Sequence, residues 1–277
     1  MKLYLNILFI LCSVLLSAQN KEFIYEYQFI PDSTNQKSIN TEIMILNIGN
    51  KKSHYYSLDK YISDSTLIAD SKKGLMTMPP NKQMINEIIY KVPAERKVTF
   101  ETKVAYSRYN VNQNVNLKWN LINEFDEILN HKVQKATTKF GGRTWTAWFA
   151  KDIPIQDGPY KFYGLPGLIL KIEDKSLSHR FLLKGIKNKA SLFEYPDRKD
   201  YSGEAKVDFK DYVKAFLQNR LDPTAQLIGK IPDQTDSEGN FKTGEQIIRE
   251  QKKLMLEHIS KDNNIIEIDI LKNKSKK

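Results

Sequence analysis

The feature that most constrains the fold is a strict alternation of aromatic and polar side chains close to the start of the chain. In the stretch "KEFIYEYQFI", aromatic residues occupy every second position from Phe23 to Phe29, and Glu26 and Gln28 lie between them. Successive side chains of a β-strand point to opposite faces, so this spacing places the rings on one face. The stretch therefore predicts a strand with one buried face.

Similar stretches follow at the spacing of hairpins. The pairs Gly49–Asn50 and Gly141–Gly142 each divide such a stretch into two strands, because these residues tolerate the positive φ of tight turns. Residues 168–173 are predicted to pair with residues 180–186 in the same way. Further strands are predicted in "NEIIYKV", "RKVTFETKVAYSRY", "VNLKWNLI" and, near the end, "IIEIDIL".

Helical periodicity is concentrated late in the chain. Apolar residues with helical spacing begin at Phe209, Asp208 is the predicted cap, and Pro223 lies beyond the predicted end. A second helix is predicted over residues 244–260. Its predicted inward residues are Ile247, Ile248, Leu254, Met255 and Ile259.

One earlier helix is predicted in "SDSTLIADSKKG", with Ser63 or Asp64 as its cap and Gly74 at its end. Hairpin-spaced strands with helices grouped near the C-terminus favour an antiparallel sheet over βαβ units. Antiparallel sheets with many strands tend to curl. We therefore predict an α+β fold that is mainly antiparallel β, with a curved, bowl-like or half-barrel sheet and a few C-terminal helices.

The first residues have the pattern of a secretory signal peptide. An apolar run after Lys2 ends in the small residues Ser17 and Ala18, and it is too short to span a bilayer. An uncleaved anchor or a buried helix is the alternative. The predicted organisation is a signal peptide over residues 1–18, a single globular domain over residues 19–271 and a basic disordered tail over residues 272–277.

Export restricts the chemistry of the mature chain. Cys12 is the only cysteine and lies inside the predicted signal peptide, so we expect no disulfide, no thiolate metal site and no cysteine nucleophile. The mature chain contains no second long apolar run, so we predict no transmembrane segment in it. The net charge is +10, but export argues against nucleic acid as a partner. The remaining interpretations are a solvated surface, an anionic lipid or an acidic glycan.

No stretch has the spacing of a catalytic or metal-binding motif. The four histidines are far apart, so we expect no metal ion and no cofactor, and we lean towards a protein that is not an enzyme. A likeness to a calcium loop in "QTDSEGNFKTGE" fails at Gln234, where aspartate is required. Candidate carboxylates for hydrolysis, with turn roles as the alternative, are Asp152, Asp157, Glu173 and Asp174.

Aromatic residues around the glycine-rich stretch are the candidate binding residues. Trp145 and Trp148 fall on opposite faces of one predicted strand, which indicates a sheet covered on both sides or a cleft wall on one. Tyr160 and Tyr163 follow in "GPYKFYGLPGLILKIEDKS". Residues 165–168 of this stretch predict a type II turn, with proline second and glycine third. Gly164 is expected to permit close packing of the backbone.

Residues 117–175 contain a set of short motifs that resembles the GLPGLI family. The motif from which the family takes its name stands at Gly164–Ile169. Further shared pairs are Lys135–Ala136, Gly142–Arg143, Ala147–Trp148, Ile153–Pro154 and Gly158–Pro159. The resemblance marks Arg143, Gly158, Pro159, Gly164, Leu165, Pro166 and Gly167 as structural motif residues. Several members carry a cysteine near the position of Val133, so a redox role does not transfer to this chain.

The resemblance implies an exported protein of Gram-negative envelopes without an established activity, whose gene often lies near TonB-dependent receptors. A fainter similarity to the bowl-shaped accessory domain of an exported peptide N-glycosidase agrees with a curved sheet and implies no glycosidase chemistry. Three hypotheses follow. The chain is a non-catalytic binding protein that acts with an outer-membrane receptor or another envelope protein, a carrier of an apolar ligand or lipid, or a secreted hydrolase. Its expected location is the periplasm, the outer membrane or the medium.

Overall fold

The computed structural model describes residues 20–49, 52–78, 82–189, 191, 193–196, 204–235 and 237–272. The predicted signal peptide and all of the predicted tail except Lys272 lie outside these residues. Within them, twelve strands form one open sheet with the order β12-β6-β5-β4-β3-β2-β1-β11-β10-β9-β8-β7, and the pairs are antiparallel except for the parallel pair β12–β6. The predicted fold class is confirmed.

The strands are β1 (Asn20–Phe29), β2 (Asn40–Ile48), β3 (Ser53–Ser57), β4 (Ile88–Val92), β5 (Lys97–Val104), β6 (Ser107–Asn114), β7 (Asn120–Ile128), β8 (His131–Phe140), β9 (Arg143–Ala150), β10 (Leu168–Asp174), β11 (His179–Lys189) and β12 (Ala205–Asp208). A separate small hairpin consists of β13 (Gln234–Thr235) and β14 (Phe241–Lys242). The helices are α2 (Leu58–Lys72), α3 (Phe209–Leu221), α4 (Gly244–Lys261) and α5 (Asp269–Lys272), with 3-10 turns at Pro93–Glu95 and Ala225–Leu227.

The first strand lies near the middle of the sheet. The chain runs outward from β1 by successive antiparallel pairs to β6, and a second run from β7 returns to β1 through β11. The alternation in β1 is confirmed, since Phe23, Tyr25 and Tyr27 are buried on the inner face, where the main hydrophobic core lies. Across the pair with β11, Tyr27 lies opposite Phe181.

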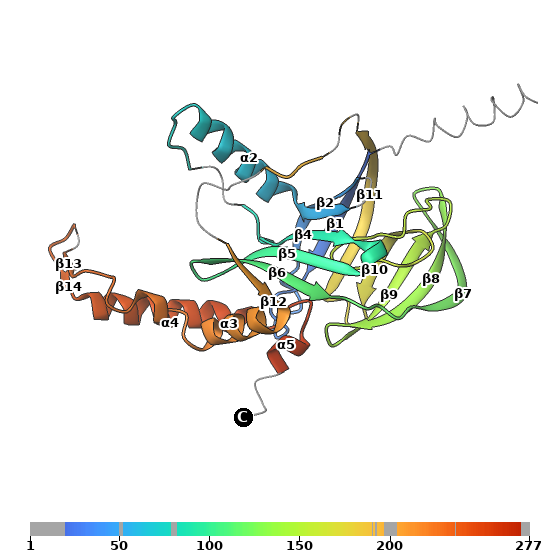
Figure 1. The fold of residues 1–277 in the computed structure, drawn as a ribbon. Coiled ribbons are helices and arrows are strands. Elements are labelled where there is room, and N and C mark those ends of the chain that lie inside the picture. The colour runs from blue at the N-terminus through green and yellow to red at the C-terminus, as the bar shows by residue number, and fades with distance from the viewer. Residues whose placement is uncertain are drawn as a thin grey trace, which may run out of the picture.

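Helices cover the sheet in two separate places (Figure 1). Helix α2 packs against β2 and β3 over a second hydrophobic cluster on the outer face, around Ile45, Tyr56 and Ile88. Helix α3 packs against β5 and β6, and α4 and α5 lie near it in Figure 1. Among the described residues, no helix is both long enough and apolar enough to cross a bilayer.

Most predicted helix boundaries are close to the observed ones. Asp208 caps α3, and its side chain accepts a hydrogen bond from the backbone of Asp211. Helix α2 begins earlier than predicted because Ser57 is its cap, so the prediction of Ser63 or Asp64 as the cap was wrong. Leu254 of α4 is 59% exposed, so its predicted inward position was also wrong.

The stretch "IIEIDIL" does not form the predicted strand. Its first residues have no regular structure, and its last residues lie in α5. The reason is that its backbone carbonyls are bound by a side chain of the sheet, as described below, and not by a neighbouring strand.

Residues 151–167, here called the plug segment, connect β9 to β10 and fold back into the core. The amides of Leu168 and Ile169 donate to the carbonyls of Ile153 and Asp157, which holds the start of β10 against the segment. Phe162 and Leu165 are buried in the main core. The plug segment is therefore a part of the interior and more than a corner of the sheet.

The turn at residues 165–168 differs from the predicted type II turn. Gly167 donates to the carbonyl of Leu165, while the amide of Leu168 is used elsewhere, and the φ of Gly167 is +155°. A Cβ at Gly167 would lie 2.1 Å from the carbonyl oxygen of Ala150. At Gly164 the nearest atom would be 4.0 Å away, so the close approach predicted for Gly164 occurs at Gly167 instead.

Candidate ligand-binding site

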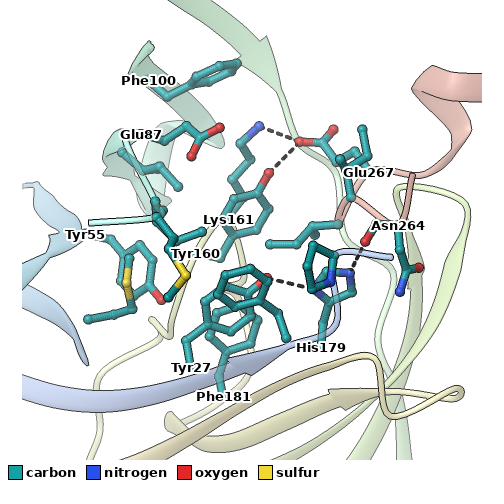
Figure 2. Close-up of a pocket in the computed structure, with 18 of the residues that line it drawn as sticks. Tyr27, Tyr55, Glu87, Phe100, Tyr160, Lys161, His179, Phe181, Asn264 and Glu267 are labelled. Carbon is teal, nitrogen blue, oxygen red and sulfur yellow. Dashed lines mark hydrogen bonds and ion pairs between the residues drawn. The ribbon is translucent and has the colours of Figure 1, made fainter. Parts of the chain in front are cut away.

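A cavity of about 260 Å³ lies between the inner face of the sheet and the C-terminal segment, which we define as residues 262–272. Strands β1, β2, β3, β4, β5 and β11, helix α3, the plug segment and the C-terminal segment all contribute to its walls (Figure 2). The lining residues are Tyr27, Phe29, Pro31, Met44, Tyr55, Met84, Ile85, Glu87, Ile89, Phe100, Tyr160, Lys161, His179, Phe181, Tyr212, Phe216, Asp262, Asn264, Ile265, Ile266, Glu267 and Ile270.

Aromatic rings form much of the wall. Tyr27 and Phe181 stack with their ring centroids 4.2 Å apart, and Phe100 meets Tyr212 edge to face at 5.3 Å. These rings come from strand positions that face inward and from the inner side of α3. An apolar wall of this kind favours the apolar part of a ligand.

A buried polar network, the Lys161 network, stands at one end of the cavity. The Lys161 ammonium lies 2.5 Å from Glu267 Oε1, 2.6 Å from Gln113 Oε1 and 3.9 Å from the centre of the Phe100 ring. Tyr160 donates to Glu267 Oε1, and Gln113 donates to Glu267 Oε2. An ammonium has three donors, and two of those of Lys161 are used in these hydrogen bonds. Both oxygens of Glu267 are occupied as well.

Arg143 explains how Glu267 reaches this position. Its guanidinium donates to the carbonyls of Asn264, Ile265 and Ile266 and lies 3.0 Å from Asp174 Oδ2. The guanidinium therefore supplies the hydrogen bonds that the backbone amides of a neighbouring strand would otherwise donate to these carbonyls. The motif residue Arg143 therefore attaches the C-terminal segment to the sheet.

The two glycines before Arg143 make room for the same segment. A Cβ at Gly141 would lie 2.8 Å from Cα of Glu267, and one at Gly142 would lie 3.0 Å from the amide nitrogen of Asp269. Both glycines also have positive φ. The glycine pair therefore forms the predicted hairpin turn and also the contact surface for the C-terminal segment.

His179 lies in the cavity wall with both ring nitrogens occupied. The Nε2 atom is 2.7 Å from the carbonyl oxygen of Asn264, and Tyr27 contacts Nδ1 at 2.7 Å. Since a carbonyl only accepts, Nε2 carries the proton and Tyr27 donates to Nδ1. Burial, together with the charge of Arg143, lowers the pKa of His179 to about 4. The imidazole is therefore neutral near pH 7.

Two polar groups of the cavity lack a full set of partners among the described residues. The carboxyl of Glu87 has no ion-pair partner there and accepts from its own backbone amide, and burial raises its pKa. The hydroxyl of Tyr55 is buried and has no hydrogen-bond partner. In Figure 2 both lie to the left, whereas Glu267, His179 and Asn264 lie to the right. Unpaired buried polar groups are costly, and in a cavity they point to a bound molecule.

The four aromatic candidates occupy different environments. Tyr160 lines the cavity, while Trp145 is fully buried in the main core against Phe162. Tyr163 is also buried, and its hydroxyl donates to the carbonyl of Val115. Trp148 is half-buried, with the Lys135 ammonium 5.7 Å from its ring. Only Tyr160 among the four lines the cavity.

The candidate carboxylates are held in separate ion pairs. Asp157 is buried against Lys91 at 2.5 Å, and Asp174 pairs with Arg143. Asp152 lies 2.5 Å from His131, and Glu173 pairs with Lys171 and Arg180. These ion pairs lie outside the cavity. None of the four carboxylates lines the cavity. Asp236 of the calcium-like stretch lies outside the described residues, and within them no group of three or more candidate ligands could hold a metal ion.

The remaining motif residues shape the plug segment. A Cβ at Gly158 would lie 2.8 Å from the side chain of Ile169, and the carbonyl of Pro159 accepts from Phe162. Leu165 is buried, whereas Gly164 and Pro166 are exposed. These residues fold the segment so that Tyr160 and Lys161 reach the cavity.

Sequence reasoning missed Glu87, Lys161 and Glu267. Lys161 stands between aromatic residues in "YKFY", which is the only local signal that its side chain is buried. Glu267 lies between Ile266 and Ile268 in the last predicted strand, so its signal is a charged residue with apolar neighbours on both sides. For Glu87 no local signal distinguishes it from a surface residue.

Comparison with known proteins gives a family of unknown function. The family model described as "Protein of unknown function (Porph_ging)" matches residues 81–171, from Glu87 and β4 through Arg143 and the plug segment to the first half of β10. No curated protein matches the chain.

Solved structures with a similar fold include PNGF-II in its C2 and P21 crystal forms. Each has a TM-score of 0.51 and 18% identity, and the match covers 73% of this chain and 34% of PNGF-II. The chain thus corresponds to about a third of PNGF-II, and the likeness is one of fold. A putative outer membrane lipoprotein-sorting protein domain from Vibrio parahaemolyticus matches with a TM-score of 0.23 and 10% identity, over 64% of this chain and 88% of that domain.

Proposed function

We propose that this chain is an exported, non-catalytic binding protein that holds a small amphipathic molecule in the cavity beneath its C-terminal segment. The observation that carries the proposal is an apolar cavity of about 260 Å³ in which, among the described residues, the Tyr55 phenol has no hydrogen-bond partner and the Glu87 carboxyl has no ion-pair partner. Ligand sites have this composition, with mostly apolar walls and a few convergent polar groups.

Binding is favoured over hydrolysis by the way the polar groups are used. Both nitrogens of His179 and both oxygens of Glu267 are occupied within the protein, and the ammonium of Lys161 makes two hydrogen bonds there. A hydrolase needs a nucleophile or base with an orienting partner, whereas Glu87 accepts only from its own backbone amide among the described residues. The carrier hypothesis is thereby preferred to the secreted hydrolase.

The proposed location rests on the sequence. Residues 1–18 have the signal-peptide pattern, and the GLPGLI resemblance is that of exported envelope proteins. That motif at residues 164–169 falls within the matched range 81–171, which supports membership of one family of unknown function. We propose the periplasm, the outer membrane or the medium as the location, and an outer-membrane receptor or another envelope protein as the partner.

The test is to detect a bound molecule and then to block its space. The exported protein is purified from its native envelope, and an organic extract is analysed by mass spectrometry for a small co-purified compound. The same analysis is applied to Met84→Trp, which enlarges a residue of the cavity wall, and to Leu254→Trp on the exposed side of α4.

We expect a stoichiometric compound in the wild type and in Leu254→Trp, and its loss in Met84→Trp. Calorimetry with small aromatic probes provides the second reading, because a ligand can dissociate during purification. If no compound co-purifies and no probe binds, the proposed function is wrong.

A further inference from the structure

We propose that the cavity selects a ligand with a cationic amine head on an apolar body, that is, a small amphipathic monoamine. The inference rests on the proposed function and deepens it. It is carried by the pairing of charges within the cavity and by two of its polar groups, the Glu87 carboxyl, which has no ion-pair partner among the described residues, and the Tyr55 hydroxyl, which has no hydrogen-bond partner there.

Three carboxyl groups line the cavity, and two of them have ion-pair partners. Glu267 is matched by Lys161 at 2.5 Å, and Asp262 is matched by Arg220 at 2.9 Å. His179 is neutral because burial lowers its pKa. Glu87 remains without an ion-pair partner among the described residues, and a ligand with one positive charge would balance it. Buried charges are stable only when paired.

The groups around Glu87 act on its carboxyl in opposite directions. Burial disfavours the ionised form most strongly, and the negative charges of Asp262 and Glu267 add to this effect. The hydrogen bond from its own backbone amide and the positive charge of Lys161 favour the ionised form, and the net result is a raised pKa. A cation bound beside Glu87 would reverse this and favour the carboxylate.

The unpaired atoms suit the donors of an ammonium. A carboxylate is an acceptor, and the Tyr55 hydroxyl has two lone pairs, so both accept from N–H groups. The aromatic wall suits the positive charge. Phe100 already holds the Lys161 ammonium 3.9 Å from its ring centre.

Other heads fit less well. An anionic head would face Glu87 and Glu267 and would find two of the three donors of Lys161 already used and its charge paired with Glu267. A neutral alcohol could bond to Glu87 but would leave the charge of the carboxylate unbalanced. The volume of about 260 Å³ corresponds to roughly nine water-sized groups, so the ligand is small.

The experiment compares three probes with the same phenylethyl body by calorimetry near neutral pH. Phenethylamine carries a cationic head, 2-phenylethanol a neutral one and 3-phenylpropionate an anionic one. We expect phenethylamine to bind at least about 10-fold more tightly than 2-phenylethanol, since hydrogen bonds to charged groups are the stronger ones. We expect 3-phenylpropionate to bind most weakly.

Glu87→Gln removes the charge of Glu87 and keeps its shape. In this variant the preference for the amine over the alcohol should fall to within about 3-fold, while the affinity for 2-phenylethanol stays close to that of the wild type. The matched control is Glu101→Gln, because Glu101 is also partly buried but bonds to Tyr90 outside the cavity. That control should retain the amine preference.

Proton release provides a reading that needs no variant. Because burial raises the pKa of Glu87 in the free protein and a bound ammonium would lower it, binding should release protons within the pH range over which Glu87 titrates, and the titrations are repeated at a series of pH values. Titrations in two buffers with different ionisation enthalpies measure this release. We expect it with phenethylamine and not with 2-phenylethanol.

The outcomes separate this inference from the proposed function. If none of the three probes binds and no compound co-purifies, the cavity is not a ligand site and both fail. If the probes bind without preference for the amine, if 3-phenylpropionate binds most tightly, or if Glu87→Gln keeps the full preference, the inference alone is wrong. Absence of proton release with phenethylamine also overturns it.

Discussion

Removal of the Arg143 side chain should destabilise the protein by about 3–5 kcal/mol, the typical effect of breaking a buried ion pair from one side. The side chains of Arg143 and Asp174 are 8% and 3% exposed and lie 3.0 Å apart. In Arg143→Ala the carboxylate stays buried with one partner fewer, and the carbonyls of residues 264–266 lose their donor. Because domains are stable by only about 5–15 kcal/mol, this is a large fraction of the total.

Urea unfolding of the wild type and of Arg143→Ala measures this loss. The matched control is Arg180→Ala, since Arg180 also lies within 3.4 Å of a carboxylate, that of Glu173, but its side chain is 45% exposed. Exposed ion pairs contribute about 0–1 kcal/mol, so the control should lose far less. Arg143→Lys keeps the charge but not the fork of donors, and it should fall between the two.

Hydrogen exchange locates the effect. The amides of Ile270 and Leu271 donate to carbonyls within the C-terminal segment. If Arg143 attaches that segment, these two amides should exchange faster in both Arg143 variants than in the wild type and in Arg180→Ala. The reasoning is refuted if Arg143→Ala costs no more than Arg180→Ala, or if exchange at the two amides is unchanged.

Three further predictions concern the interior. Gly167→Val should prevent folding, as judged by circular dichroism, because its Cβ would lie 2.1 Å from the oxygen of Ala150, and a wild-type melting curve would contradict this. Lys91→Met should lower the free energy of unfolding in urea by about 3–5 kcal/mol, because it leaves the Asp157 carboxylate buried without its partner. The double variant with Asp157→Leu should recover most of this loss, and a double variant that recovers none would argue against the buried pair. The free energy of unfolding should fall by up to about 3 kcal/mol as the pH falls from about 6.5 to about 4. In this pH window the unfolded chain binds a proton at His179 and the folded protein does not. His179→Gln should therefore flatten the dependence of stability on pH.

The alternation of side chains predicted most of the sheet because each inward strand position meets the same core. Phe23, Tyr25 and Tyr27 all lie where a period of two places them. The same rule failed for "IIEIDIL", whose pattern is that of a strand. There the decisive interaction is between Arg143 and three backbone carbonyls more than 120 positions away, and no local pattern carries that information.

The candidate site was only partly predictable for a similar reason. Tyr160 was identified because aromatic residues in a glycine-rich stretch suggest binding. Its neighbour Lys161 has a buried side chain only because Glu267 pairs with it from 106 positions away. Glu87 comes from a third region of the chain, so the polar groups of the cavity form no motif in sequence.

The residues of the glycine-rich motifs also hold the segments that form the cavity. Gly141, Gly142 and Arg143 hold the C-terminal segment, and Gly158 and Gly167 allow the plug segment to pass through the core. These residues thereby place Glu267 and Lys161 against each other. Substitutions in the motifs will therefore alter stability and binding together, and neither effect alone can assign a function to them.

Glu87 differs from every other charged residue of the cavity. The Lys161–Glu267 pair and the Asp262–Arg220 pair join separate segments, so their loss would disturb the fold that forms the site. Glu87 has no ion-pair partner among the described residues, and burial raises its pKa, so its ionised form is disfavoured in the empty protein. The bound state is the one in which an ammonium would give that carboxyl its partner.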